Sequence, residues 1–237
     1  APGAILEVYL GGQAVGEATA NALFGRVNPS GKLAETIPYR LEDNPSYLNF
    51  PGDGKRVEYR EGIFVGYRYY EAKKMPVRYP FGHGLSYTEF AYRDLTFSRE
   101  EMEEGGRITV SLKVKNVGSR AGKEVVQLYV ADHTGAAVRP PKELKNFVKV
   151  ELQPGEEKTV SMELDTRSLA WYQEEIRDWY AASGEYEILV GSSSQDIRLR
   201  GTISYRSHTR LPFRVHANTT LGELLARPET RRLVEEE

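Results

Sequence analysis

The sequence predicts a mixed fold, in which a partial α/β sandwich is followed by an antiparallel β-sandwich and a short helical tail. An apolar run at 4–9, then glycines and an alanine-rich stretch, is the pattern of a buried strand, a turn and a helix. After residue 93 apolar residues recur at every second position in several short runs. We therefore expect domains at 1–88 and 89–205, and a tail at 206–237.

The first domain begins with the apolar run at 4–9, which Gly11 and Gly12 interrupt. The alanines that follow favour a helix ending at Gly25. A strand of this kind usually lies in a parallel sheet that is covered on both faces, and one strand and one helix cannot complete such a sheet. We therefore expect further strands from a part of the protein outside this chain. Residues 41–55 are rich in Asn, Pro, Gly and Asp, which predicts a long surface loop.

The second domain is predicted from its period of two. Apolar residues alternate with polar ones along 108–114, which predicts a strand with one buried face and one solvent-exposed face. The pattern recurs at 126–130, 148–152, 160–164, 186–190 and 197–203. Glycine-containing turns separate these runs, as in hairpins and Greek-key connections. Roughly seven strands in about a hundred residues is the size of an immunoglobulin-like or fibronectin-like domain.

The tail is predicted to be helical. Thr219 or Thr220 can cap a first helix, and Pro228 can begin a second one. The leucines of the first helix are too few to form a core. We expect them to dock on this chain, on a missing domain or on another subunit, so a homo-oligomer held by the tail is one partner hypothesis. The leucines concerned are Leu221, Leu224 and Leu225.

Charge and composition exclude several function classes. The 32 basic and 34 acidic residues give a net charge of −2, which does not suit binding to nucleic acid. No apolar run approaches the roughly 20 residues of a membrane-spanning helix, so no membrane partner is expected. The absence of cysteine rules out thiolate metal sites, and four scattered histidines do not suggest a metal centre. The composition leaves the compartment open between the cytoplasm and export.

Five motifs are more specific than any packing rule would require. They are GGQAVG at 11–16, ALFG at 22–25, NPSGKL at 28–33, EGIFVGYR at 61–68 and PFGHGLSYT at 80–88. Together they resemble the family 3 glycoside hydrolases. The resemblance covers the end of that family's α/β-sandwich domain, and the strands that follow look like its fibronectin type III-like domain.

This resemblance implies a β-glucosidase or a related exo-acting β-glycosidase, which acts with retention through a covalent glycosyl-enzyme and needs no cofactor. In the family the nucleophile is an Asp of a (β/α)8-type barrel, and the acid/base is usually a Glu that precedes the motif at 11–16. Neither region is present, so no residue here is assigned a catalytic role and the isolated chain is predicted to be inactive. A β-glucoside or oligosaccharide would be bound through the missing domains, with the barrel upstream or, in a reversed order, downstream.

About half of the chain's aromatic residues lie between positions 47 and 92. We interpret most of them as filling a seam between packed domains, because aromatic rings supply large buried surfaces. Those on the long loop can instead reach a substrate cleft. The candidates for the rim of that cleft are Tyr47, Phe50, Tyr59 and Glu61. For Glu61 the alternative is a surface carboxylate or one paired with Arg68.

A second hypothesis is that the chain is a non-catalytic carbohydrate-binding or interaction module. It is motivated by Trp171 and Trp179, which flank a short polar segment, and by the aromatic loop. Packing at a core or an edge is the alternative for both tryptophans. His83 stands between two glycines, and we interpret it as a structural residue of a turn.

Overall fold

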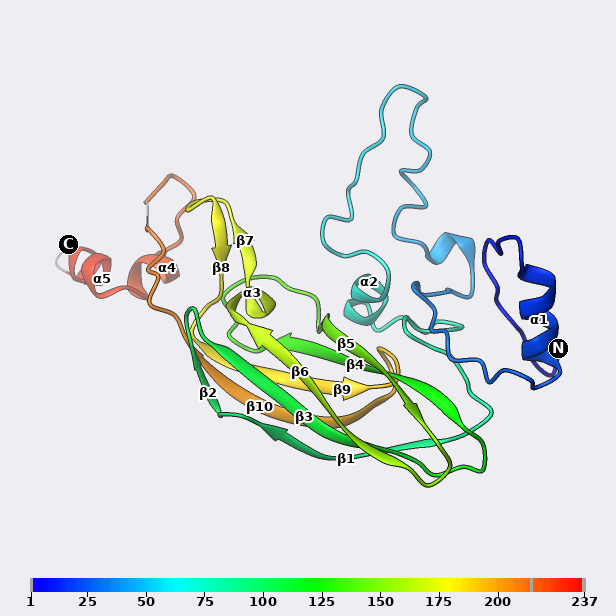
Figure 1. The fold of residues 1–237 in the computed structure, drawn as a ribbon. Helices are drawn as coiled ribbons and strands as arrows, with labels where there is room; N and C mark the ends of the chain where they lie inside the picture. Colours follow the sequence, from blue (N-terminus) through cyan, green and yellow to red (C-terminus); the bar gives the residue numbers. More distant parts are fainter. Residues whose placement is uncertain (1, 214, 236–237) are drawn as a thin grey trace.

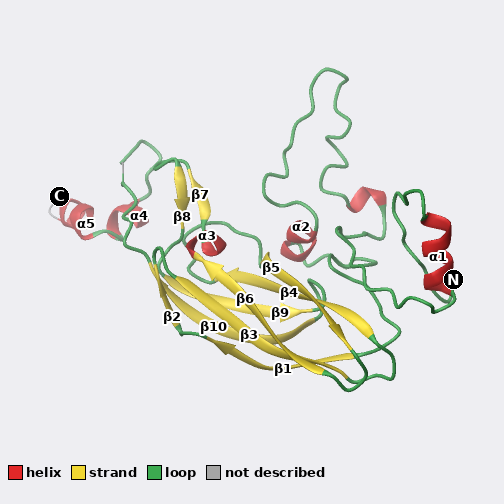
Figure 2. Cartoon of the chain, viewed as in Figure 1, coloured by secondary structure: helices red, strands yellow, loops and turns green. Residues whose placement is uncertain are grey.

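The computed structural model describes residues 2–213 and 215–235 (Figures 1 and 2). The helices are α1 (Val15–Leu23), a 3-10 turn η1 (Leu41–Asp43), α2 (Tyr67–Ala72), α3 (Thr166–Leu169), α4 (Leu221–Leu225) and α5 (Pro228–Glu235). The strands are β1 (Phe90–Phe97), β2 (Glu101–Glu103), β3 (Arg107–Asn116), β4 (Gly122–Asp132), β5 (Glu143–Leu152), β6 (Glu157–Asp165), β7 (Trp171–Gln173), β8 (Asp178–Tyr180), β9 (Gly184–Gly191) and β10 (Ile197–Arg206). The predicted mixed fold class is confirmed.

The β-sandwich consists of a sheet in the order β1-β3-β6 and a sheet in the order β2-β10-β9-β4-β5, with β7 and β8 as a separate hairpin. Neighbouring strands are antiparallel, as predicted, except that β2 runs parallel to β10. Because β2 and β10 lie far apart in the sequence, no tight turn forces them to be antiparallel.

The strand β3 shows why the sandwich forms. Its apolar residues Ile108, Val110, Leu112 and Val114 are at most 1% exposed, and polar residues alternate with them. They belong to one core with apolar side chains of β4, β6 and β9. Each fully buried aliphatic side chain contributes about 1.5–3 kcal/mol. Four such side chains on one strand contribute about 6–12 kcal/mol, which is comparable to a domain's net stability of about 5–15 kcal/mol.

The strand β4 is buried on both faces, which its sequence pattern does not predict. One face contributes Val126, Leu128 and Val130 to the sandwich core. The other face carries Gln127, Tyr129 and Ala131, which are also buried. A second apolar cluster explains this, since Tyr67 of α2 and Phe81 pack against Tyr129. The outer face of β4 is thus the surface on which the N-terminal part of the chain rests.

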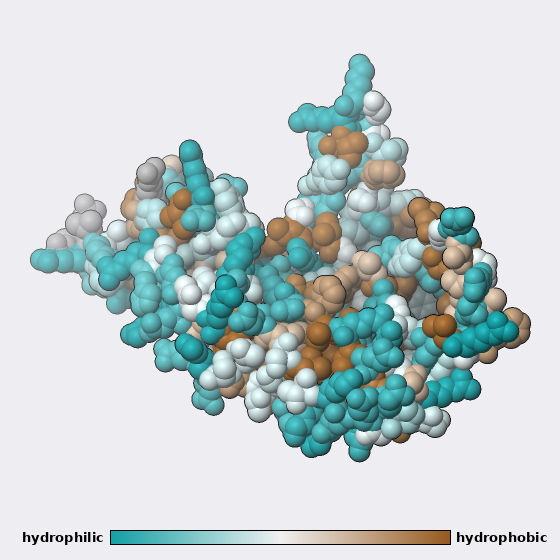
Figure 3. Space-filling model, viewed as in Figure 1, coloured by the Kyte–Doolittle hydropathy of each residue, from teal (hydrophilic) through white to brown (hydrophobic). Residues whose placement is uncertain are grey.

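The strand that we predicted at residues 4–9 is wrong, because these residues form no regular element. Leu6, Val8 and their apolar neighbours are exposed, and Leu10 is fully exposed. A buried strand needs neighbours for its amide and carbonyl groups, and no described strand pairs with this segment. Figure 3 shows apolar residues open to solvent on the right-hand, N-terminal side of the molecule.

The other N-terminal predictions fare better. The helix expected before Gly25 is α1, and residues 41–55 carry only the short turn η1. The helix α2 and the strand β1 were not anticipated. In β1 the register shifts between Arg93 and Thr96, and Asp94 adopts a positive φ of 57°, so apolar residues do not alternate cleanly there.

The tail forms the two predicted helices. Thr220 begins α4 with a capping box, in which its hydroxyl accepts from the Glu223 amide and the Glu223 carboxylate accepts from the Thr220 amide. Pro228 begins α5. In Figure 1 the tail lies beside the β7–β8 hairpin, at the opposite end of the molecule from α1. No helix in the described part of the chain is both long and apolar enough to cross a membrane.

The start of the tail is fixed by one carboxylate. Glu104, which follows β2, accepts hydrogen bonds from the amides of His208 and Thr209 at 2.6 and 2.8 Å. It also accepts from the Thr209 hydroxyl at 2.6 Å. These bonds lower the pKa of Glu104, with the Thr209 hydroxyl as the largest cause. The chain is therefore held at the point where it leaves β10.

Candidate functional site

Three of the four predicted rim residues lie on a loop that projects from the molecule, above α2 in Figure 1. Tyr47, Phe50 and Tyr59 are 43%, 72% and 82% exposed. Short polar side chains shape this loop locally. Asp53 accepts hydrogen bonds from the amides of Lys55 and Arg56 at 2.9 and 2.8 Å, which closes the tip as an Asx turn. The three aromatic rings are thus exposed on the segments that flank this turn.

The fourth rim candidate, Glu61, lies in a pocket of about 360 Å³ at the base of this loop. One carboxylate oxygen, Oε2, is buried and has no hydrogen-bond partner among the described residues. Arg68 pairs with Glu143 at 3.4 Å, so the pairing of Glu61 with Arg68 is wrong. The pocket is lined by Pro45, Arg60, Glu61, Phe64, Tyr69, Ala72 and Lys73. The structure therefore places Glu61 in a pocket and the three loop aromatics outside it.

The motifs at 28–33 and 80–88 are joined by hydrogen bonds. The Asn28 side-chain oxygen accepts from the Ser86 hydroxyl at 2.9 Å and from the Tyr87 amide at 2.8 Å. The Lys32 ammonium donates to the Gly84 carbonyl and pairs with Glu124 of β4, both at 3.2 Å. These bonds fasten the two motifs to each other and to the sandwich.

Gln127 of β4 continues this attachment. Its side-chain nitrogen donates to the carbonyls of Gly82 and Ser192 at 3.1 and 2.6 Å, and its oxygen accepts from the Tyr129 hydroxyl at 2.6 Å. Gly82 has a φ of +79°, and a Cβ there would lie 2.1 Å from the Gln127 Oε1. Both the backbone conformation and the close approach therefore require glycine at this position of the motif.

His83 is part of this turn. Its ring stacks on Tyr79 at 5.4 Å, and its amide donates to the Pro80 carbonyl at 3.1 Å. Burial, with a smaller effect from Lys32, lowers the pKa of His83. No group of three or more His, Cys, Asp or Glu side chains is placed to hold a metal ion within residues 2–213 and 215–235.

The most buried acidic side chains have cationic partners. Asp132 pairs with Arg139 at 3.2 Å, and Arg139 also contacts Glu143. Glu143 also forms an ion pair with Lys145. Buried charges need such partners, because an unpaired one loses its hydration without compensation. These carboxylates are therefore compensated by cations within the chain.

The tryptophans lie on the β7–β8 hairpin. Trp171 packs edge-on against Tyr180 on one face, and Tyr172 packs edge-on against Trp179 on the other. Tyr172 and Trp179 are about half exposed. The guanidinium of Arg167 lies over the ring of Trp179 and occupies one of its faces. This arrangement favours packing at an edge over a flat platform for sugars.

Sequence reasoning missed several residues that hold this site together. Gln127 lies between apolar residues in a strand, where only the burial of both faces reveals its role. Lys32 and Asn28 were noticed as parts of a motif, but their bonds to residues 84–87 join segments more than 50 positions apart. A buried amide in a strand and polar residues in a glycine-rich turn are the signals that could have indicated them.

Two family models match the chain. The Glycosyl hydrolase family 3 C-terminal domain matches residues 1–87, and the Fibronectin type III-like domain matches residues 124–194. The first match ends just before β1, and the second runs from β4 to the loop after β9.

Similar proteins are known by sequence and by structure. The chain is 54% identical over 222 residues to thermostable beta-glucosidase B of Acetivibrio thermocellus, covering 94% of this chain and 29% of that protein. It is 47% identical to probable beta-glucosidase K of Emericella nidulans, covering 86% and 24%. The crystal structure of a GH3 beta-glucosidase from Bifidobacterium adolescentis superposes with a TM-score of 0.85 at 39% identity, covering 96% and 33%. The structure of beta-glucosidase 3B from Thermotoga neapolitana in complex with glucose has a TM-score of 0.77 at 44% identity, covering 84% and 27%. The chain thus spans a third or less of each relative.

Proposed function

The chain belongs to the family 3 glycosyl hydrolases, as part of such a hydrolase, and on this premise we propose that it is the C-terminal portion of a retaining β-glucosidase. The enzyme would release nonreducing-end β-D-glucosyl residues from β-glucosides and oligosaccharides. The observation that carries the proposal is the 54% identity to a β-glucosidase over nearly the whole chain. The attachment of the family motifs at 28–33 and 80–88 to β4 supports it.

We propose that this portion is structural and that the catalytic Asp and Glu lie elsewhere in the protein. A retaining glycosidase needs two carboxyl groups about 5–5.5 Å apart that are free to react. Here the most buried carboxylates are held by Arg139, Lys32 and Lys142. The exposed apolar residues at 5–10 and 23–27 support a docking role, since such surface favours contact with another part of a protein.

A chimera tests both proposals. The matching segment of the Acetivibrio relative would be replaced by residues 1–237, and β-glucosidase activity would be measured with an aryl β-glucoside. We expect activity in the chimera and none in the isolated chain or in the relative without this segment. A folded but inactive chimera would contradict the family function. Hydrolysis by the isolated chain would contradict the structural role alone.

We propose that the loop and Glu61 form part of the substrate rim. Support comes from the exposed rings of Phe50 and Tyr59 and from the unpartnered Glu61 oxygen in its pocket. In the active chimera, Tyr59→Ala and Glu61→Gln should raise KM for cello-oligosaccharides several-fold while kcat stays similar, because a rim residue binds substrate without touching the reacting bond. Leu48→Ala is the matched control, since Leu48 is 91% exposed on the same loop. An unchanged KM in both variants would remove this proposal.

The alternative function, a non-catalytic carbohydrate-binding or interaction module, is favoured by the same exposed rings on the loop. It predicts that the isolated chain binds cello-oligosaccharides through Phe50 and Tyr59. Titration of Phe50→Ala, with Leu48→Ala as control, distinguishes it from a rim that needs the missing domains.

We also propose that the tail contacts another subunit. The helix α4 is capped by Thr220, and its first residue, Leu221, is 60% exposed. An exposed leucine on a capped helix is available to a partner surface. Removing residues 211–237 should then lower the oligomeric mass measured by light scattering, and an unchanged mass would discard this assembly.

A further inference from the structure

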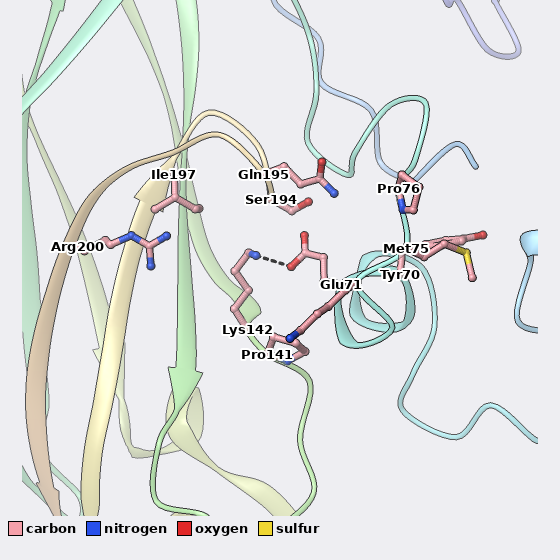
Figure 4. A pocket seen from close by; sticks show the side chains of 11 residues that line it. Tyr70, Glu71, Met75, Pro76, Pro141, Lys142, Ser194, Gln195, Ile197 and Arg200 are labelled. Carbon is pink, nitrogen blue, oxygen red and sulfur yellow. Dashed lines mark hydrogen bonds and ion pairs between the residues drawn. The ribbon is translucent and has the colours of Figure 1, made fainter. Parts of the chain in front are cut away.

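A second pocket, of about 540 Å³, lies where α2 meets the sandwich (Figure 4). Its walls come from the end of α2 and residues 74–76, from residues 141–142 before β5, and from residues 194–200 around the start of β10. None of these residues lines the Glu61 pocket, which faces another side of α2. The two pockets are therefore separate.

Two buried polar atoms of this pocket have no partner. Glu71 is 9% exposed in its side chain, and one of its oxygens is paired with Lys142, whereas Oε1 is buried without a hydrogen bond among the described residues. Ser194 is fully buried, and its hydroxyl also lacks a partner there. Native proteins pair about nine-tenths of their buried polar groups. Two of the five such atoms among the described residues belong to side chains that line this one pocket, where a bound molecule could complete their bonds.

The charges of the pocket limit what that molecule can be. Lys74, Lys142 and Arg200 would repel a metal ion or an organic cation. An inorganic anion would suit these cations, but it would stand beside the free oxygen of Glu71, which needs a donor. A hydroxyl group satisfies both demands, because it donates to a carboxylate and accepts from an ammonium.

The size and the lining of the pocket also suit a small organic molecule. A single water molecule occupies about 30 Å³ and cannot fill this pocket. Its volume lies in the range of about 300–1,000 Å³ that is usual for small-molecule sites. Met75, Pro76, Pro141 and Ile197 supply apolar surface next to the polar groups. Figure 4 shows Glu71 reaching from α2 towards the side of the pocket that carries Ser194 and Gln195.

We propose that this pocket binds a neutral, hydroxyl-rich ligand of the size of a mono- or disaccharide. Glu71 Oε1 accepts from one ligand hydroxyl, and the Ser194 hydroxyl bonds to another. The Gln195 amide and Lys74 lie on the same pocket and offer further donors. The ligand would join α2 to the β9–β10 loop, away from the aromatic loop and independently of any hydrolytic activity.

The test is a calorimetric titration of the 237-residue protein with glucose and with cellobiose, combined with amide NMR shifts. We expect saturable binding with the largest shifts at Ser194, Gln195 and Glu71. Ser194→Ala removes an atom without a partner in the free protein, so the fold should tolerate it while sugar affinity falls roughly tenfold. Thr36→Val is the matched control, because Thr36 also carries a buried, unpartnered hydroxyl but lines neither this pocket nor the one at Glu61.

A second variant, Glu71→Gln, removes the carboxylate, and its unfolding midpoint shows whether the fold survives the loss of the Lys142 pair. Reduced sugar affinity in Ser194→Ala, with unchanged affinity in Thr36→Val, would support the site. Equal affinity in the wild type and Ser194→Ala, or no binding up to about 100 mM sugar, would overturn it. Sodium phosphate is the second probe, and phosphate that binds more tightly than either sugar and displaces it would reassign the pocket to anions.

Discussion

The substitution Gln127→Ala should strongly destabilise the protein, because this side chain joins the N-terminal motifs to the sandwich. It would leave three groups without partners, the Gly82 and Ser192 carbonyls and the Tyr129 hydroxyl. Tyr129 is fully buried. A buried group without a partner costs about 1–3 kcal/mol, so after water relieves part of this the loss should be about 3–6 kcal/mol. That is a large share of the usual stability of about 5–15 kcal/mol.

Urea unfolding followed by circular dichroism would measure this loss. Gln153→Ala is the matched control, because Gln153 is exposed, and it should change stability by less than about 0.5 kcal/mol. Adding Tyr129→Phe to the Gln127 variant should recover about 1–2 kcal/mol, since the orphaned hydroxyl is gone. Equal stability of the Gln127 and Gln153 variants would refute the reasoning.

Two further predictions concern a glycine and the start of the tail. Gly82→Ala should destabilise by about 1–3 kcal/mol more than Gly54→Ala, because both positions have positive φ but only at Gly82 does a Cβ meet Gln127; equal midpoints in urea would show that the close approach is relieved without cost. Glu104→Ala should increase amide hydrogen exchange at His208 and Thr209, while Glu101→Ala, an exposed control, should not. Because the pKa of Glu104 is lowered in the fold, its contribution is present above about pH 4.3 and is lost as pH falls through the folded pKa, so acid should remove this protection in the wild type. Protection that is independent of pH would contradict the role of this carboxylate.

How much of the fold the sequence predicts depends on where each segment finds its partners. The six alternating runs became strands because their inward residues share one core within the chain. The run at 4–9 is just as apolar, but it forms no strand because no described strand pairs with it. Hydrophobic pattern thus indicates what a segment can do, and hydrogen-bond partners decide whether it does so.

The candidate site shows the same limit. The aromatic concentration predicted a seam, and Tyr67 and Phe81 do pack against Tyr129 there. Phe50 and Tyr59 lie on a loop of polar composition, and for this reason the sequence predicts that they belong to a substrate rim and not to the seam. Both rings are exposed in the structure. The partner of Arg68 could not be predicted, because Glu143 comes from a strand 75 positions further along the sequence. Contacts between distant segments depend on the sandwich, which no local pattern describes.

The attachment of the N-terminal motifs to β4 sets an order for folding during synthesis. Lys32 leaves the ribosome 95 residues before Gln127, and both Glu124 and Gln127 must be in place before the motifs at 28–33 and 80–88 can be fastened. At about 5–20 residues per second, this delay is roughly 5–20 s. Tyr67 and Phe81, which pack against the Tyr129 cluster of β4 in the folded chain, stay unpacked from their own synthesis until β4 has emerged. The translating chain therefore carries an unpacked aromatic segment until its own later strand emerges, and a chaperone would matter most during this interval.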